Sequence, residues 1–347
     1  MSNSIIKQVV GIDVSQKELV VCLGRMYADM SPELYSHSCF ANTTAGMQKL
    51  VKWVDKQTGK DISLRFVMEA TGVYHESLAY FLHEQGYSTS IILPNKISNY
   101  ARTLDTKTVT DKTASQAIAM FGLERKLSDW KPPSKAFKML RQLTREREQL
   151  VQMRTMVKNH LHAEKAEAQP NKGSIERMNK QVTLFTKQIA EIGTAIDELI
   201  RQNEAMKSAT KLCCTIPGVG KLTAAIVLAE TNGFDLIRSK KQLVSYAGLD
   251  VKEKQSGTSV KGKAHISKKG NRYLRKALHM PALGAIKYDE RFKGIFSRLV
   301  SKHGIKMKAV VAVQRKVLEL MYTLFKNQTA YDRNYFKRLE SSNVATL

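Results

Sequence analysis

Three carboxylates in the first third of this chain stand where predicted structural elements begin or end. Asp13 and Glu69 each close an apolar run that predicts a strand, and Asp111 opens a helical pattern. Asp13 as a turn former and Asp111 as a helix cap are the ordinary alternatives. Carboxylate oxygens are the donors that Mg²⁺ or Mn²⁺ prefers, and two such ions can hold the attacking and leaving oxygens of a phosphate. The three residues therefore predict a metal-assisted phosphoryl-transfer site, at which they are both ligands and catalytic groups.

The elements that must position these carboxylates alternate between strand and helix. The run IIKQVVGIDVSQKELVVCLG predicts a hairpin, and SLRFVMEATG and YSTSIILPN predict two further strands. Between those strands, TGVYHESLAYFLHEQG has the apolar spacing of a helix. Thr110 or Asp111 stands where a helix cap is expected before AIAMFGL. This order indicates an α/β domain over residues 1–130.

Positive charge is concentrated in the other two thirds of the chain. Residues 1–130 hold 14 Lys or Arg and 13 Asp or Glu, so nearly all of the net charge of +25 lies beyond them. Charge is densest over residues 252–276, where nine bases face the single acid Glu253 and glycines and serines are interleaved. A solvated loop is the alternative, but such a segment suits a polyanion, because cations displace its counterions and glycines permit close approach. The predicted nucleic-acid contacts here are Lys254, Lys261, Lys263, Lys268, Lys269, Arg272 and Arg275.

Composition excludes several other classes of protein. The four cysteines form no CxxC pair and have no His at zinc-finger spacing, which favours reduced thiols over a disulfide or zinc site. The N-terminus reaches an acid too early for a signal peptide, and no apolar run approaches the ~20 residues that span a bilayer. We therefore expect a cytoplasmic protein, associated with the bacterial nucleoid and without a membrane partner.

The middle of the chain has a helical pattern on either side of a break. WKPPS predicts a linker, and AQPNKGS interrupts the helical pattern that starts at Lys135. Outward positions of the first arm carry bases, Arg145 among them. Apolar residues of the second arm recur in alternating steps of three and four: Ile175, Met178, Val182, Phe185, Ile189, Ile192, Ile196 and Leu199. This seam predicts a helical hairpin or coiled coil over residues 131–207, either as an antiparallel pair within one chain or as a dimer surface.

The segment PGVGK resembles a phosphate-binding loop only superficially. Thr215 and Leu222 stand where the Walker pattern needs Gly and Ser or Thr, so we expect no ATP binding. Between two apolar helical stretches the segment fits a helix-hairpin-helix, in which Gly218, Gly220 and Lys221 would face a DNA phosphate. A tight interhelical turn is the alternative. We expect a mainly helical domain over residues 208–330, followed by a tail over 331–347.

Together these motifs resemble a family of insertion-sequence transposases. GIDVS, MEATGVY and TDKTAS are similar to the RuvC-like, RNase-H-fold domain of the DEDD transposases of the IS110 family, with KTVTDKTAS most like its IS1111 branch. TIPGVGKLTAAIVLAE, YAGLD and QSGTSVKGKAHISKKGNRYLR resemble the family's C-terminal domain. The family's fourth carboxylate is replaced here by Ala114. Either three carboxylates suffice, or Asp105 or Ser115 substitutes, or activity is impaired.

The resemblance implies a chemistry and a set of partners. It implies that Ser256 of the QSG motif, with Ser259 as fallback, attacks DNA and forms a phosphoserine link beside Mg²⁺ held by the carboxylates. It also implies double-stranded DNA partners (element ends and target), a structured guide RNA that bridges them, and a homo-oligomer (dimer or tetramer). The alternatives are a RuvC-like structure-specific nuclease that uses water as the nucleophile, of the Holliday junction resolvase type, and an architectural protein with a decayed site.

Overall fold

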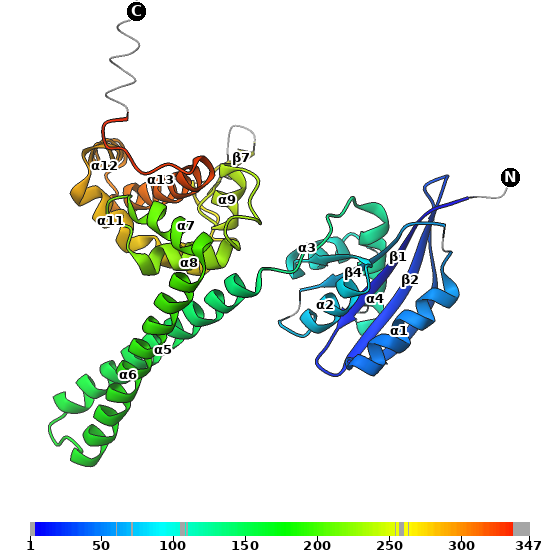
Figure 1. The fold of residues 1–347 in the computed structure, drawn as a ribbon, viewed down its shortest axis with the longest axis horizontal. Helices are drawn as coiled ribbons and strands as arrows, with labels where there is room; N and C mark the ends of the chain where they lie inside the picture. Colours follow the sequence, from blue (N-terminus) through cyan, green and yellow to red (C-terminus); the bar gives the residue numbers. More distant parts are fainter. Residues whose placement is uncertain are drawn as a thin grey trace, which may run out of the picture. The chain divides into compact units, whose positions relative to one another are not determined.

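The chain divides into two units between the prolines of the WKPPS segment (Figure 1). Unit 1 is Met1–Pro132 and unit 2 is Pro133–Leu347. The computed structural model describes residues 4–59, 61–70, 72–104, 108, 110–253, 255–256, 260–262 and 264–335. The finer boundaries at 207 and 330 stay predictions.

Unit 1 contains a five-stranded mixed sheet in the order β3-β2-β1-β4-β5. Its strands are β1 (Ile5–Val14), β2 (Glu18–Tyr27), β3 (Pro32–Ala41), β4 (Leu64–Glu69) and β5 (Ser88–Ile92). The first three strands are antiparallel neighbours, whereas β4 runs parallel to both β1 and β5. The predicted hairpin is β1–β2. Strand β3 was not predicted, because its polar side chains and partly exposed faces lack an apolar signal.

Helices cover both faces of this sheet, which confirms the predicted α/β class. They are α1 (Thr44–Gln57), α2 (Glu76–Glu84), α3 (Pro94–Ala101) and α4 (Asp111–Glu124). One face packs its even-numbered β1 and β4 residues against α1 and α2. The opposite face packs Val9 and Val67 against Ile118 and Leu123 of α4. Because side chains alternate along a strand, odd-numbered residues of β1 and β4 belong to the α4 face.

Unit 2 is largely helical, as expected. Its helices are α5 (Lys135–Ala166), α6 (Lys172–Gln202), α7 (Glu204–Cys214), α8 (Lys221–Thr231), α9 (Lys240–Tyr246), α10 (Arg272–Ala277), α11 (His279–Tyr288), α12 (Glu290–His303) and α13 (Lys306–Asn327). Four short strands lie between α9 and α10: β6 (Val251–Lys252), β7 (Gln255–Ser256), β8 (Val260–Lys261) and β9 (His265–Ile266). Throughout the part of the chain that the structure describes, no helix is long and apolar enough to cross a bilayer.

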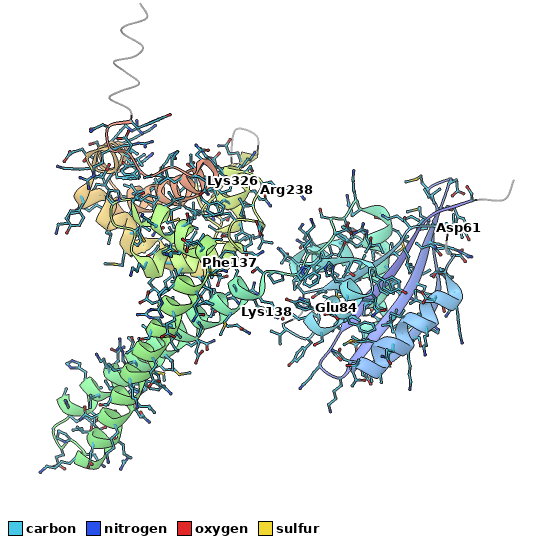
Figure 2. All side chains as sticks on the ribbon, viewed as in Figure 1. Asp61, Glu84, Phe137, Lys138, Arg238 and Lys326 are labelled. Carbon is cyan, nitrogen blue, oxygen red and sulfur yellow. The ribbon has the colours of Figure 1, made fainter. Side chains whose placement is uncertain are left out.

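Helices α5 and α6 form the predicted hairpin, paired within one chain (Figure 1). Ile189, Ile192 and Ile196 of the seam are buried, whereas the part of the seam between Ile175 and Phe185 is only half-buried. The start of α5 packs on the helical body of unit 2. The ring of Phe137 lies so close to Gly233 that a Cβ added there would be 2.7 Å from it. Figure 2 shows the side chains of both units and labels Phe137.

Candidate active site

The strand register of unit 1 brings two of the predicted carboxylates side by side. Ile12 pairs with Met68 across the parallel strands β1 and β4, so the residues that follow, Asp13 and Glu69, are neighbours at the carboxyl ends. Paired strands lie about 4.8 Å apart. Both residues belong to the α4 face, and both are half-buried.

Helix α4 lies directly on strand β1, because glycines allow the two backbones to meet. A Cβ on Gly11 would lie 2.4 Å from the backbone nitrogen of Ala119 and 2.5 Å from the carbonyl oxygen of Ser115. A Cβ on Gly122 would lie 2.7 Å from Val9. Later residues of α4 thus cover earlier residues of β1, so the helix runs antiparallel to the strand.

This direction places the third carboxylate beside the other two. Asp111 lies one turn before Ser115, which covers Gly11, and Asp13 lies two residues beyond Gly11 on the same face. The structure therefore brings Asp13, Glu69 and Asp111 to one end of the α4 face.

Both ends of α4 are held by hydrogen bonds. The Thr110 hydroxyl accepts from the Thr113 backbone N–H at 3.2 Å, which confirms Thr110 as the cap and leaves Asp111 as the first helical residue, exposed at the positive end of the helix dipole. At the other end, the Lys7 ammonium donates to the carbonyl oxygens of Gly122 and Leu123 at 2.6 and 2.7 Å. Sequence reasoning missed Lys7, because a lysine in an amphipathic strand looks like a solvated charge.

The three carboxylates are coupled electrostatically. Burial, together with the negative charges of Asp111 and Glu69, raises the pKa of Asp13 to about 6. A site of three repelling oxygen donors has the chemistry that suits a hard divalent cation. Among the described residues, no group of three or more His, Cys, Asp or Glu is close enough to hold an ion directly. The donor chemistry fits such a cation, and direct ligation requires the side chains to turn toward one another.

The candidates for the absent fourth carboxylate have different surroundings. Ser115 is fully buried, and its hydroxyl donates to the Lys112 carbonyl oxygen at 2.8 Å. Ala114 is half-buried on α4 and offers no ligand atom. Asp105 lies outside the described residues.

In unit 2, Ser256 lies on a two-part antiparallel ribbon. Strand β6 pairs with β9 through Val251 and Ile266, and β7 pairs with β8 through Ser256 and Val260. Lys254, Ser259 and Lys263 lie outside the described residues, and only the backbones of Ser256 and Lys261 are described. The QSG motif therefore begins on strand β7, which holds Gln255 and Ser256.

The base of this ribbon is closely packed around two glycines. A Cβ on Gly270 would lie 2.5 Å from the Tyr246 carbonyl oxygen, and Gly248 has a positive φ of 66°. Arg275 donates to the carbonyl oxygens of Ala247 and Gly270 at 2.8 and 3.0 Å, so part of its guanidinium is used to hold this base. The neighbouring cations predicted for nucleic acid, Lys268, Lys269 and Arg272, are exposed.

A buried carboxylate joins the segment at the base of the ribbon, where α10 begins, to the helical hairpin. Glu230 is 1% exposed and accepts two hydrogen bonds from Arg145, at 2.7 and 2.8 Å, and one from Asn271 at 2.6 Å. The Asn271 side-chain oxygen in turn caps α10, accepting from the Tyr273 N–H at 2.9 Å. The sequence placed Arg145 on an outer face of α5. That placement is wrong, because Arg145 pairs with a carboxylate from α8 that must be neutralised where it is buried.

The two glycines of PGVGK have different surroundings. Gly218 has a φ of 86°, and its Cβ would lie 2.6 Å from the Pro281 carbonyl oxygen, so it lets the α7–α8 turn pack on α11. Gly220 precedes α8, a Cβ added to it would meet nothing within 4 Å, and Lys221 beside it is exposed. The helix-hairpin-helix stays a prediction; of its two glycines, Gly220 has room for a Cβ and Gly218 has none.

Comparison with known proteins adds two matching sequence families. Residues 10–164 match a transposase family of the DEDD type found in IS110 elements, and residues 210–296 match the transposase family IS116/IS110/IS902. A pilin gene-inverting protein of Moraxella bovis is 26% identical over 94% of this chain and 98% of its own length, and that of Moraxella lacunata is equally similar. An uncharacterized 43.6 kDa protein of the insertion element IS110 from Streptomyces coelicolor is 27% identical over 40% of this chain and 36% of its own length.

Two solved structures show distant likeness. T. thermophilus RuvC in complex with a Holliday junction substrate matches 35% of this chain and 99% of its own, with a TM-score of 0.28 and 9% identity. An Aquifex aeolicus member of the Ppx/GppA family matches 94% of this chain and 92% of its own, with a TM-score of 0.22 and 10% identity. At scores this low, neither likeness adds to the topology described above.

Proposed function

Because the chain belongs to the IS110 family of transposases, we propose that it recombines double-stranded DNA through a covalent serine–phosphate intermediate. The observation that carries this proposal is the convergence of Asp13, Glu69 and Asp111 in unit 1, in a chain whose basic unit 2 bears the Ser256 ribbon. We take the mixed sheet of unit 1 to be RNase-H-like, as the resemblance of its motifs implies.

The carboxylates of unit 1 would hold the divalent cation, Mg²⁺ or Mn²⁺. When bound, such a cation neutralises charge on a phosphate and favours ionisation of a coordinated hydroxyl. Asp13 and Glu69 approach from neighbouring strand ends, and Asp111 approaches from the start of α4, so the three oxygen donors converge from two sides. Their mutual repulsion favours any arrangement that brings positive charge between them.

Ser256 would act as the nucleophile. Its hydroxyl oxygen forms a bond to phosphorus while the bond from phosphorus to one sugar oxygen breaks, and the serine proton passes to solvent or to the departing sugar oxygen. The exposed cations at the base of the ribbon would stabilise charge on the phosphate. Because the phosphodiester is exchanged for a phosphoserine of similar energy, rejoining needs no ATP, in keeping with the absent Walker pattern.

The proposed partners follow from charge and from the relatives. Double-stranded DNA, as element ends and targets, suits the basic unit 2, and the name of the Moraxella proteins suggests inversion of a segment between two sites. A structured guide RNA and a homo-oligomer, dimer or tetramer, complete the proposal. The chemistry requires the carboxylates and Ser256 to meet, within one chain or between protomers.

A covalent trapping experiment tests the serine assignment. The full chain is incubated with Mg²⁺, co-purified RNA and plasmid targets, and protein–DNA adducts are separated by denaturing electrophoresis. Wild-type protein and the Ser259→Ala control are expected to form an adduct, whereas Ser256→Ala is not. An adduct formed by Ser256→Ala would contradict the assignment. Cleavage that leaves free 5′-phosphate ends and no adduct would instead favour the water-using nuclease.

A further inference from the structure

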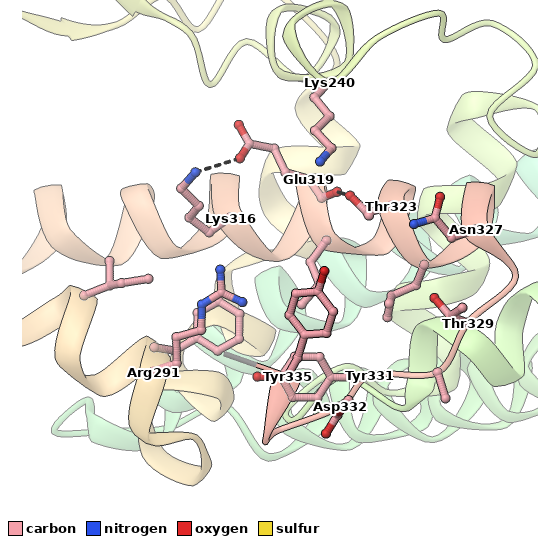
Figure 3. Close-up of a pocket in the computed structure, with 15 residues that line it drawn as sticks. Lys240, Arg291, Lys316, Glu319, Thr323, Asn327, Thr329, Tyr331, Asp332 and Tyr335 are labelled. Atoms are coloured by element: carbon pink, nitrogen blue, oxygen red, sulfur yellow. Dashed lines mark hydrogen bonds and ion pairs between the residues drawn. The ribbon is translucent and has the colours of Figure 1, made fainter. Parts of the chain in front are cut away.

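Unit 2 contains a pocket that is lined neither by the Ser256 ribbon nor by the start of α8. It has a volume of about 590 Å³ and lies along α12 and α13, bounded by the segment 329–335 that follows α13 (Figure 3). This volume falls within the range of about 300–1,000 Å³ that small-molecule sites occupy. None of the groups proposed above for catalysis or DNA binding lines it.

The wall made by segment 329–335 is fixed in place. The Tyr331 backbone N–H donates to the Thr215 hydroxyl at 2.9 Å, and the Tyr331 phenol donates to a side-chain oxygen of Asp289 at 2.8 Å. Burial, and then the hydrogen bond to Asp289, raises the pKa of Tyr331 to about 12, which keeps the phenol protonated as a donor. The pocket is therefore a built feature, formed where a chain segment is tied back across two helices.

The pocket combines apolar walls, an accessible aromatic ring and cations. Phe292, Leu320 and Leu324 supply apolar surface, and Tyr335 at the rim is 53% exposed. Lys240 of α9, Arg291 of α12 and Lys316 of α13 bring positive charge from three elements. In Figure 3 the side chain of Lys240 approaches α13 from one side of the helix, and those of Arg291 and Tyr335 lie on the other.

Two acids also line the pocket, and their charge is partly balanced. Glu319 forms ion pairs with Arg315 at 2.8 Å and with Lys316 at 3.0 Å. Asp332 accepts a hydrogen bond from the Asn334 N–H at 2.8 Å. By contrast, within the described residues neither the Lys240 ammonium nor the Asn327 side-chain amide has a hydrogen-bond or ion-pair partner. One cation and one amide are thus available to a ligand.

We propose that this pocket binds one unstacked nucleotide of a single-stranded nucleic acid. An aromatic ring beside apolar walls suits the face of a base, the Asn327 amide can donate to and accept from the edge of a base, and Lys240 suits the adjoining phosphate. A paired base cannot enter a pocket, because it is held within the helical stack. The inference rests on the proposed function only in taking a nucleic acid as the partner.

Single-strand binding tests the pocket without any strand cleavage. Fluorescein-labelled octanucleotides with a central 5-iodouracil, as RNA and as DNA, are titrated with the full chain in EDTA, and the bound complex is photo-crosslinked. We expect Tyr335→Leu to weaken binding about tenfold, since stacking on an aromatic ring contributes roughly 1–3 kcal/mol per base. Lys240→Gln is expected to weaken binding several-fold, and crosslinks are expected in residues 329–335 for at least one of the two oligonucleotides.

The matched control is Tyr288→Leu, a change at an exposed tyrosine of α11 that does not line the pocket. It should leave single-strand binding unchanged, and a duplex of the same sequence should bind all variants equally. Wild-type affinity for both oligonucleotides in Tyr335→Leu and in Lys240→Gln would overturn the proposal, as would equal weakening by Tyr288→Leu. If uridine monophosphate binds as tightly as the octanucleotides, the occupant is a free nucleotide and the single-strand assignment is wrong. Because EDTA suppresses cleavage, loss of the Ser256 chemistry would leave these results unaffected.

Discussion

Asp13 is the residue of the candidate site whose pKa is clearly shifted by its surroundings. It ends a buried strand beside Glu69 and faces the start of the helix that carries Asp111. Burial and two neighbouring negative charges act in the same direction, against ionisation. The folded protein therefore retains a proton on Asp13 at pH values where an exposed aspartate has lost it.

This coupling predicts a pH-dependent stability of unit 1. The pKa of Asp13 rises from 3.8 to about 6 on folding. The folded protein is therefore destabilised by ionisation of this carboxyl, an effect that is absent below about pH 4 and complete above about pH 6. Because the carboxyl is only half-buried, solvent screening reduces this effect to about 1 kcal/mol. In EDTA, Asp13→Asn should thus be about 1 kcal/mol more stable than wild type at pH 7.5 and equally stable at pH 4.

Urea unfolding followed by tryptophan fluorescence measures this difference, since both tryptophans, Trp53 and Trp130, lie in unit 1. Asp61→Asn, at an exposed carboxylate of the same unit, serves as the control and should change neither value. Addition of Mg²⁺ at pH 7.5 should raise the urea midpoint of wild type and leave that of Asp13→Asn nearly unchanged. A variant less stable than wild type at pH 7.5 in EDTA would contradict the proposed repulsion.

At the scale of elements, glycines decide which surfaces can meet. Gly11 and Gly122 let α4 rest on β1, and Gly218 lets the α7–α8 turn rest on α11. Buried polar contacts then fix the arrangement: Lys7 holds the end of α4, and Glu230 joins α5, α8 and the start of α10. Positions that look like phosphate-binding motifs in sequence can therefore serve the packing of helices.

The two glycines of PGVGK should respond differently to substitution by alanine. Gly218→Ala places a methyl group 2.6 Å from a backbone oxygen at a positive φ, so we expect a loss of about 2–4 kcal/mol in the unfolding free energy of unit 2. Gly220→Ala meets nothing within 4 Å and should cost about 1 kcal/mol or less, which is the preference of a helix cap for Gly over Ala.

Circular dichroism during urea unfolding compares the two variants directly. If Gly218 served mainly to admit a phosphate, Gly218→Ala would keep wild-type stability and lose only nucleic-acid affinity. Gly220→Ala is the matched control, because it changes the same turn without a steric conflict.

At the scale of the whole molecule, charge separates the two units. Unit 1 is close to neutral, whereas unit 2 holds nearly all of the net charge of +25. When lysines and arginines of unit 2 neutralise phosphates, the counterions of the nucleic acid are released into solution. The affinity for nucleic acid should therefore fall steeply as the salt concentration rises.

The double variant Lys268→Gln, Lys269→Gln should reduce the salt dependence of DNA binding. Affinity falls as salt rises, and each lost phosphate contact reduces the steepness of log affinity against log salt by about 0.9. Loss of both contacts should therefore reduce the steepness by about 2. Fluorescence anisotropy with a DNA duplex over a salt series measures this slope. Lys49→Gln, Lys52→Gln on exposed positions of α1 is the control and should leave the slope unchanged. An equal change of slope in the control would indicate diffuse charge rather than a contact at the base of the ribbon.

The sequence by itself was enough to predict the α/β character of residues 1–130, the helical hairpin, a helix cap at Thr110 or Asp111 and the segregation of charge. These features depend on local periodicity, cap chemistry and composition, which neighbouring residues in the chain already contain. Membership of the transposase family was also predicted from the sequence, because its motifs occur in the expected order along the chain. By contrast, β3, α1 and α3 were not predicted. Strand β3 lacks an apolar signal, whereas α1 does carry a local one, in its Thr43 cap and in the helical spacing of its buried residues.

Only the tertiary structure decided how residues distant in sequence combine. The proximity of Asp13, Glu69 and Asp111 depends on the parallel register of β1 and β4 and on the close approach of α4 at Gly11. Other contacts also join residues far apart in the chain: Lys7 with Gly122, Arg145 with Glu230, and Tyr331 of the pocket wall with Thr215. Such contacts form because buried polar groups must find a partner, and the sequence shows that need without showing which residue meets it.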